Sequence, residues 1–378
     1  MPVVAVVKSD LAPEAVRENT KRAIDLAGGF ADLIENGDKV LIKPNFVAPL
    51  PYATTDLNVI RCVVNEIRKC GGEPIIGESS GFEFDTEWVF KIIGITKLAE
   101  ELNVKLVNFD KEKFIKIKIQ NFPVSEILLP EMLLDVKKII NMPKLKMHKQ
   151  TNVSLGMKNL MGLPHRESRR LIHILGLEKN IAALSNFFNP IFNVVDGLIV
   201  PKEGAVYGKF DTLGLILAGR DTLAIDNICC RILGVNPETV PYISLANKAH
   251  FFNLSRVKVV GDYDKNEILV MSITNNHNKF SKTIYKLLAR GMYLFDYLYS
   301  RLTPRRSLIP YFNLKFGIRP KVVKSDCYDL QKCIDSCPVG AISGNPLKID
   351  YRKCMHVRCL KCISECSGSI VMQSNKNK

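Results

Sequence analysis

Short apolar runs alternate with stretches of helical spacing along residues 1 to about 260. The runs are VVAVV at 3–7, DKVLI at 38–42, EPIIG at 73–77, VKLVN at 104–108, KKIIN at 137–141, IFNVV at 191–195 and LGLIL at 213–217. Strands that are apolar almost throughout are typical of sheets buried on both faces. Between several of them lie helical stretches, such as 57–67 before Gly71-Gly72 and 181–188. The order predicts an α/β fold, an open and mostly parallel sheet with helices on both faces.

The length of 378 residues predicts about two domains and a small appended module. We expect an α/β domain at 1–265, a basic aromatic helical connector at 266–324 and a small module at 325–378. With 47% hydrophobic and 24% charged residues, the composition excludes general disorder. The opening apolar run meets a charge at Lys8, which is unlike a signal peptide or a membrane span, so we expect a cytoplasmic protein.

Seven of the eleven cysteines gather near the C-terminus. They are Cys327, Cys333, Cys337, Cys354, Cys359, Cys362 and Cys366. In a protein without a secretory signal, clustered cysteines favour metal binding over disulfides.

The spacing can be compared with the ferredoxin run C-x2-C-x2-C-x3-C-P, in which three thiolates bind one 4Fe-4S cluster and the fourth binds the other. If each cluster takes three cysteines from one run and the fourth from the other, one set is complete. It consists of Cys354, Cys359 and Cys362 from the second run and Cys337 from the first. The other set has three thiols, because Leu330 stands where a fourth would be. We therefore expect one 4Fe-4S cluster in a ferredoxin-like α+β module, and a second site that holds a 3Fe-4S or 4Fe-4S cluster or stays empty. His356 is an alternative ligand, and a zinc knuckle is the competing interpretation.

The connector carries most of the net charge of +15. Residues 279–324 contain eleven Lys and Arg against one acid, Asp296, with nine aromatic residues among them. Thr303-Pro304 ends a predicted helix. The simplest interpretation is a connector packed on the α/β domain with its charges in solvent. Contact with an anionic membrane surface or a redox partner protein is the alternative, and nucleic acid is the least favoured partner.

Polar residues follow three of the predicted strands. Lys43-Pro44-Asn45 follows the second run, the segment 142–148 follows the fifth, and Asp196-Gly197 ends the sixth. Ligands of open α/β sheets bind at the carboxyl ends of strands. We expect an anionic small-molecule substrate or cofactor there. The expected binding residues are Lys43, Asn45, Lys144, Lys146, Lys158 and Asn159. No glycine-rich phosphate loop of the Rossmann or Walker type occurs.

Two histidines and one aspartate are candidates for chemistry at this site. His148 or His173 could donate a proton, and either could bind a metal together with Asp196. A structural role for the histidines is the simpler alternative.

The motifs described above resemble the DUF362 family when they are taken together. The resemblance rests on Lys43-Pro44-Asn45, Lys144-Leu145-Lys146-x-His148, Thr151, Lys158-Asn159-Leu160-x-Gly162, His173 and Asp196-Gly197. It runs from about residue 38 to 250, and members are often followed by a 4Fe-4S ferredoxin module. The resemblance implies an α/β domain coupled to redox centres, without fixing an activity. The segment 203–208 departs from the glycine-proline turn that the family tends to have after Asp-Gly.

The leading hypothesis is an iron-sulfur oxidoreductase that moves electrons between its clusters and an anion in the α/β crevice. The alternative is a non-catalytic electron carrier or maturation partner that docks to a larger enzyme.

Overall fold

A computed structural model describes most of the chain. The described residues are 1–119, 122–201, 206, 210–270, 279–303, 308–309, 319–323, 329–355, 359–366 and 369–373. For 268–270, 279–286, 364 and 371–373 only the backbone is described. Cys327, His356 and nearly all of the 203–208 segment lie outside these ranges.

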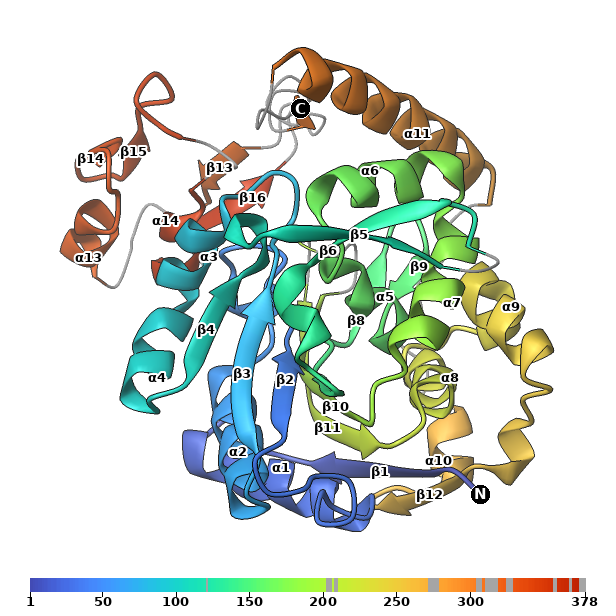
Figure 1. Cartoon of the computed structure of the whole chain (residues 1–378). Helices are drawn as coiled ribbons and strands as arrows, with labels where there is room; N and C mark the ends of the chain where they lie inside the picture. The colour runs from blue at the N-terminus through green and yellow to red at the C-terminus, as the bar shows by residue number, and fades with distance from the viewer. Residues whose placement is uncertain are drawn as a thin grey trace.

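Eight strands form one mixed sheet, in the order β12-β1-β11-β10-β7-β2-β3-β4 (Figure 1). They are β1 (Val3–Lys8), β2 (Lys39–Lys43), β3 (Glu73–Glu78), β4 (Lys105–Asn108), β7 (Lys138–Asn141), β10 (Phe192–Pro201), β11 (Phe210–Gly219) and β12 (Lys258–Gly261). Neighbouring strands are parallel, except that β11 is antiparallel to both β1 and β10. The α/β prediction is confirmed, and each predicted apolar run forms a strand of this sheet.

Helices cover both faces of the sheet because its strands are apolar on both sides. In β1, Ala5 and Val7 join one core, whereas Val4 and Val6 join the other. The first core contains residues of α1 (Pro13–Leu26), α2 (Leu57–Lys69), α3 (Thr86–Ile93) and α4 (Ile95–Glu101). The second contains residues of α5 (Gly156–Asn159), α6 (Arg166–Leu175), α7 (Leu177–Phe188), α8 (Thr222–Ile232) and α9 (Pro241–Ala249).

Smaller elements complete the domain. Two antiparallel pairs are β5 (Phe114–Lys118) with β6 (Glu126–Pro130) and β8 (Lys146–His148) with β9 (Asn152–Ser154). Single 3-10 turns are η1 (Pro51–Ala53), η2 (Phe109–Lys111), η3 (Glu131–Leu134), η4 (Leu160–Gly162), η5 (Pro237–Thr239) and η6 (Leu254–Arg256). The short helix α10 (Lys265–Val270) lies at the start of the connector.

The connector contains one long helix, α11 (Lys279–Leu302), which lies along α6 (Figure 1). It ends at the predicted Thr303-Pro304 stop. Arg170 of α6 forms a buried ion pair with Asp296 of α11, and Glu167 accepts a second contact from Arg301 at 2.9 Å. The helix is therefore packed on the α/β domain. Within the described residues, no helix combines the length and the apolar character needed to cross a membrane.

The C-terminal module consists of short elements around its cysteines. They are β13 (Arg319–Val322) paired with β16 (Ile370–Gln373), β14 (Ile342–Ser343) paired with β15 (Lys348–Ile349), α13 (Leu330–Asp335) and α14 (Lys361–Glu365). Its apolar side chains, including Ile342, Leu360 and Ile363, belong to the same core as α3. The indole of Trp88 on α3 donates a hydrogen bond to the Cys359 carbonyl at 3.1 Å. The module thus packs against the α3 side of the domain.

Candidate functional site

The parallel strands β7, β2 and β3 bring three chain segments to one edge of the sheet. Their carboxyl ends lead into Met142, Pro44-Asn45 and Ser79, and Lys43 stands opposite Asn141 in the register. A cavity of about 290 Å³ opens at this edge. Its described lining includes Asn45, Glu78, Ser79, Phe82, Glu83, Lys146, His148, Lys158, Asn159, Arg169, His173 and Tyr293. We call it the basic pocket.

Six of the nine residues expected at this site line the basic pocket. They are Asn45, Lys146, His148, Lys158, Asn159 and His173. Lys43, Lys144 and Asp196 do not line it. Their expected location is corrected, because each is held in an ion pair in the protein interior.

Lys43 and Glu78 form the first of these ion pairs. The Lys43 ammonium donates to the Glu78 carboxylate at 2.7 Å and to the Pro44 carbonyl at 2.8 Å, and both side chains are buried. Burial lowers the pKa of Lys43, and the charge of Glu78 opposes this shift. The Glu78 carboxylate also accepts hydrogen bonds from the backbone N–H groups of Phe46 and Ser79. The Lys43 charge is thus compensated inside the protein.

Lys144 and Asp196 form the second ion pair, at 2.7 Å, and both are buried. The Asp196 carboxylate also accepts from the backbone N–H of Asp56 at 2.7 Å and of Leu198 at 3.0 Å. These contacts join the loop before α2 to β10. They indicate a structural role for Asp196, since its oxygens are occupied by interior donors.

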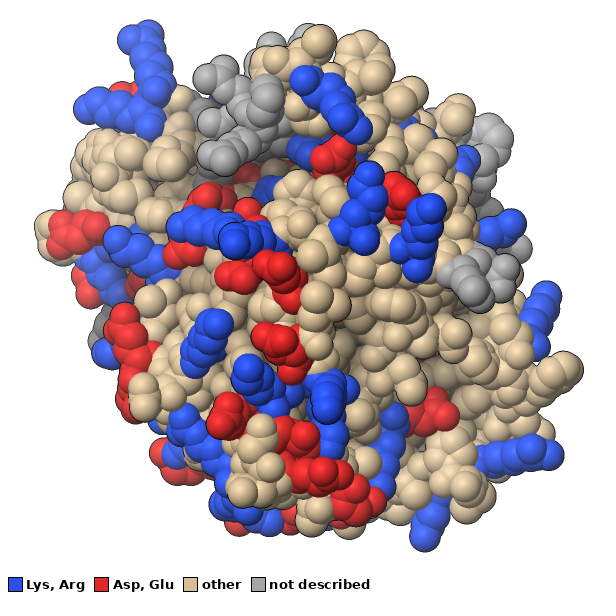
Figure 2. Space-filling model, in the orientation of Figure 1, with Lys and Arg blue, Asp and Glu red and all other residues tan. Residues whose placement is uncertain are grey.

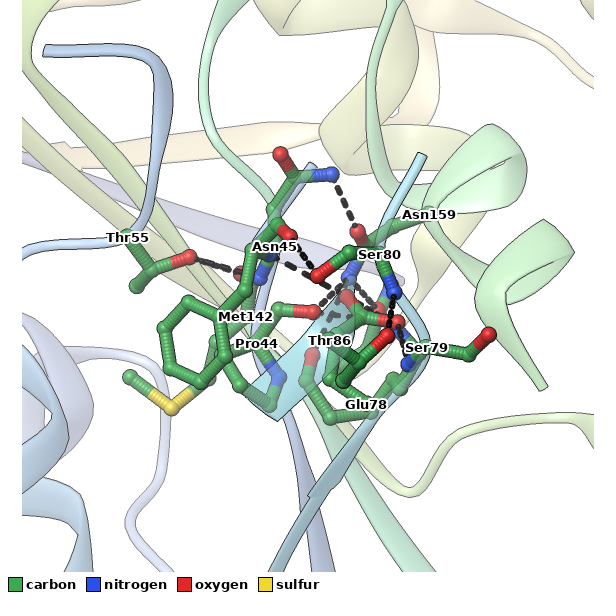
Figure 3. Close-up of polar contacts among 12 residues, drawn as sticks. Pro44, Asn45, Thr55, Glu78, Ser79, Ser80, Thr86, Met142 and Asn159 are labelled. Carbon is green, nitrogen blue, oxygen red and sulfur yellow. Dashed lines mark hydrogen bonds and ion pairs between the residues drawn. The ribbon is translucent and has the colours of Figure 1, made fainter. Parts of the chain in front are cut away.

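Hydrogen-bonded amide side chains support the pocket wall, and Figure 3 shows two of them, Asn45 and Asn159. Asn159 donates to the Lys43 carbonyl at 3.0 Å and to the Asn141 side chain at 2.8 Å, and it accepts from Asn45 at 2.8 Å. The Asn45 oxygen accepts from the Lys146 ammonium at 2.7 Å. That Asn45 and Asn159 orient a ligand stays a prediction; in the structure Asn45 also positions Lys146, and Asn159 holds Asn45.

Basic side chains converge in the pocket. Burial and the nearby Lys158 and Lys144 charges lower the pKa of Lys146 well below its usual value. Burial lowers the pKa of Lys158 to about 8. Within the described residues no side chain pairs with the Lys158 ammonium. Repulsion between these neighbouring cations is relieved by a bound anion, so the electrostatics suit a negatively charged ligand.

The two histidines face this cluster in different ways. His148 Nδ1 accepts from the backbone N–H groups of Gln150 and Thr151, at 3.1 and 3.2 Å, so the neutral ring carries its proton on Nε2. Burial and the Lys158 and Lys146 charges lower the pKa of His148 well below its usual range. His148 is therefore a neutral donor that can hydrogen-bond an anion.

His173 is buried on α6 and stacks on Tyr293 of α11, with ring centroids 4.1 Å apart. Its Nδ1 has no hydrogen-bond partner in the described structure. Burial first, then the Lys158 and Arg169 charges, lower its pKa well below the usual range. An unpaired buried ring nitrogen beside the pocket marks a place where a ligand group can bind.

Sequence analysis missed several residues of the pocket. Glu78 and Ser79 follow the predicted strand 73–77, so the strand-end rule that selected Lys43 could also have found them. Arg169 and Tyr293 come from α6 and α11. No local signal connects these helices with the sheet edge, because only the tertiary packing brings them there.

Four thiols of the C-terminal module line a second, small cavity of about 20 Å³. They belong to Cys337, Cys354, Cys359 and Cys362, the four residues expected to form the complete ligand set. Pro320, Ile342, Ile349 and Leu360 add apolar walls. Burial raises the pKa of Cys359 and Cys362, and the neighbouring thiols raise both further. We call this the thiol cavity.

Cys333 and Cys366, the other described cysteines of the module, are not among the residues that line the thiol cavity. Cys333 and Cys366 are buried, and the Ser336 hydroxyl lies 3.8 Å from the Cys366 sulfur. Their expected companion Cys327 is outside the described residues.

Sites for a single metal ion are a separate question. In the described part of the chain, no three His, Cys, Asp or Glu side chains are arranged to hold one metal ion. His148, His173 and Asp196 thus do not form a metal site.

The fold and the basic pocket define an α/β protein with a pocket lined by basic side chains at the carboxyl edge of its sheet. Residues 40–231, just over half of the chain, match the family model described as a domain of unknown function (DUF362), and the chain belongs to this family. A thylakoid-associated protein of Synechocystis sp. is 26% identical over 224 residues, which are 57% of this chain and 68% of that protein. The lactate racemase apoprotein of Thermoanaerobacterium thermosaccharolyticum matches with a TM-score of 0.42 and 14% identity. That match covers 61% of this chain and spans only 56% of the racemase chain.

Proposed function

We propose that this protein is an iron-sulfur oxidoreductase that moves electrons between a 4Fe-4S cluster in its C-terminal module and an anion bound in the basic pocket. The observation that carries the proposal is the thiol cavity. Cysteines from three separate segments of the module, around 337, 354 and 359–362, meet at one apolar cavity.

The chemistry of the thiol cavity fits such a cluster. A 4Fe-4S cluster takes one thiolate at each of four iron atoms, so its ligands surround a volume and do not converge on a single ion. The backbone N–H of Ala341 donates to the Cys337 sulfur at 3.2 Å, and N–H donors of this kind tune the potential of iron-sulfur centres. When bound, the cluster supplies single-electron transfer. The second cluster remains a prediction.

A continuous set of contacts joins the thiol cavity to the basic pocket. Cys359 accepts from Trp88 on α3, and Thr86 at the start of α3 donates to Asp110 at 2.6 Å. Asp110 lies 3.6 Å from Arg169, which lines the pocket. These contacts hold the module and the pocket wall on one scaffold.

The pocket supports an enzyme over the alternative, a simple electron carrier. A carrier needs an exposed docking face and no interior ligand site. The basic pocket instead contains Lys158, which has no partner among the described side chains, a neutral N–H donor at His148 and an unpaired nitrogen at His173. Carboxylates and phosphates are the ligand classes that such donors bind.

The test is metal analysis of anaerobically purified protein. We expect iron and sulfide at a minimum of four each per chain, on the basis of one 4Fe-4S cluster. Cys362→Ala should lose most of this iron because one iron atom is left without its thiolate. Cys70→Ala is the matched control, since Cys70 lies at the end of α2, outside the module, and it should keep the wild-type iron content.

Stoichiometric zinc with negligible sulfide would contradict the cluster. The oxidoreductase itself is tested by reducing the loaded protein and adding organic carboxylates and phosphate esters one at a time. If one class of compound accepts the electrons, the absorbance of the oxidised cluster returns. Its return in the wild type, and its absence in Lys146→Ala with unchanged iron content, supports the enzyme. No recovery with any of them, in protein that exchanges electrons with a small redox protein, favours the carrier.

A further inference from the structure

Helix α11 has two contrasting faces. Its inner face contributes Ala289, Tyr293 and Asp296, which are packed against α6 and the basic pocket. Its outer face exposes large apolar side chains to solvent. They are Leu287, Leu288, Leu294, Phe295, Leu298 and Leu302, which are 46–83% exposed.

The exposed side chains form a continuous stripe. Leu287, Leu294, Leu298 and Leu302 follow one another at helical spacing, with the exposed Gly291 filling the one gap. Isolated exposed leucines are ordinary, but a contiguous apolar stripe marks an interaction surface. In Figure 2, the upper right ridge, where Figure 1 places α11, is largely uncharged with separate Lys and Arg side chains on it.

The charges of the same segment are almost all positive. Residues 279–324 have eleven Lys and Arg and a single acid, Asp296. That acid is buried and paired with Arg170, so it leaves the outer face without a negative charge of its own. Arg290 is exposed beside the stripe, and Arg301, which is also exposed but paired with Glu167 of α6, follows near its end.

We propose that α11 binds the surface of an anionic lipid bilayer, with its apolar stripe inserted among the lipid chains and its basic residues at the headgroups. Apolar insertion and attraction to anionic lipids are the two contributions that hold an interfacial helix. A second copy of the chain is a poorer occupant, because it would bring two basic segments together. The inner face of the same helix borders the basic pocket, so binding would place that pocket close to the bilayer.

Vesicle co-sedimentation of the full chain tests this surface. The probes are vesicles of phosphatidylcholine alone and of an equal mixture of phosphatidylcholine and phosphatidylglycerol, each at low and high ionic strength. We expect binding to the mixed vesicles, weakened at high ionic strength because salt screens the attraction. Phe295→Ser with Leu298→Ser should weaken it by roughly a hundredfold, since each buried apolar side chain contributes about a factor of ten.

The matched control is Leu134→Ser, because Leu134 is 63% exposed on η3 and outside the stripe. This variant should bind as the wild type does. Unchanged circular dichroism of the double variant shows that the loss is not caused by unfolding. No binding to mixed vesicles, or equal binding by the double variant, would overturn the proposal. A wild-type dimer that becomes monomeric in the double variant, without vesicle binding, would identify the stripe as a protein interface.

Discussion

The interior beneath the carboxyl edge of the sheet and the basic pocket above it use the same residue type in opposite ways. Below, Lys43 and Lys144 are buried, and each has one carboxylate, Glu78 or Asp196, at 2.7 Å. Above, Lys146 donates to neutral oxygens of Asn45 and Ala53, and Lys158 has no partner among the described side chains. A buried charge with an ion-pair partner indicates a structural role, and a buried charge without one indicates a ligand-binding site.

The largest effect, on the free energy of unfolding, should come from removing the lysine that pairs with a buried carboxylate. Lys144→Ala leaves Asp196 buried without its counter-ion, which should lower the free energy of unfolding by about 3–5 kcal/mol. Chemical denaturation measures this loss. Lys158→Ala is the matched pocket variant and should cost less than about 1 kcal/mol. Equal losses in the two variants would remove the distinction between the two regions.

An intermediate effect is expected on anion binding. Lys146→Ala removes one charge-assisted hydrogen bond worth about 1.5–3 kcal/mol, so sulfate affinity should fall roughly tenfold to a hundredfold. Isothermal titration calorimetry with sulfate measures the change, and iron content should stay the same because the thiol cavity is in another module. Sulfate binding that is unaffected by this substitution would show that the pocket is not the anion site.

The smallest effect concerns the pH dependence of the same binding. Lys158 has its pKa lowered to about 8, so it is charged below that pH and neutral above it. The affinity for sulfate should be highest well below pH 8 and should fall above it. Because one proton is involved, the fall is at most tenfold per pH unit. Arginine stays charged throughout, so Lys158→Arg should flatten the profile. A profile that is flat in the wild type would show that Lys158 does not contact the anion.

The sequence predicted the sheet well because its strands are apolar on both faces, a pattern that local reading detects. The strand-end rule selected Asn45, Lys146 and His148, and these three residues line one pocket in the structure. It could not separate Lys43 and Lys144 from them, because Glu78 and Asp196 are distant in the sequence and only the strand order brings them into contact. Tyr293 was beyond prediction, since it depends on how α11 packs across α6.

The hydrogen bond between Trp88 and Cys359 gives the molecule a built-in optical reporter. Trp88 is the sole tryptophan of the chain, and it lies at the seam between the α/β domain and the C-terminal module. All indole fluorescence therefore originates beside the thiol cavity. Its emission should therefore change when the proposed cluster binds, and this can be measured with no label attached and no background from the rest of the fold.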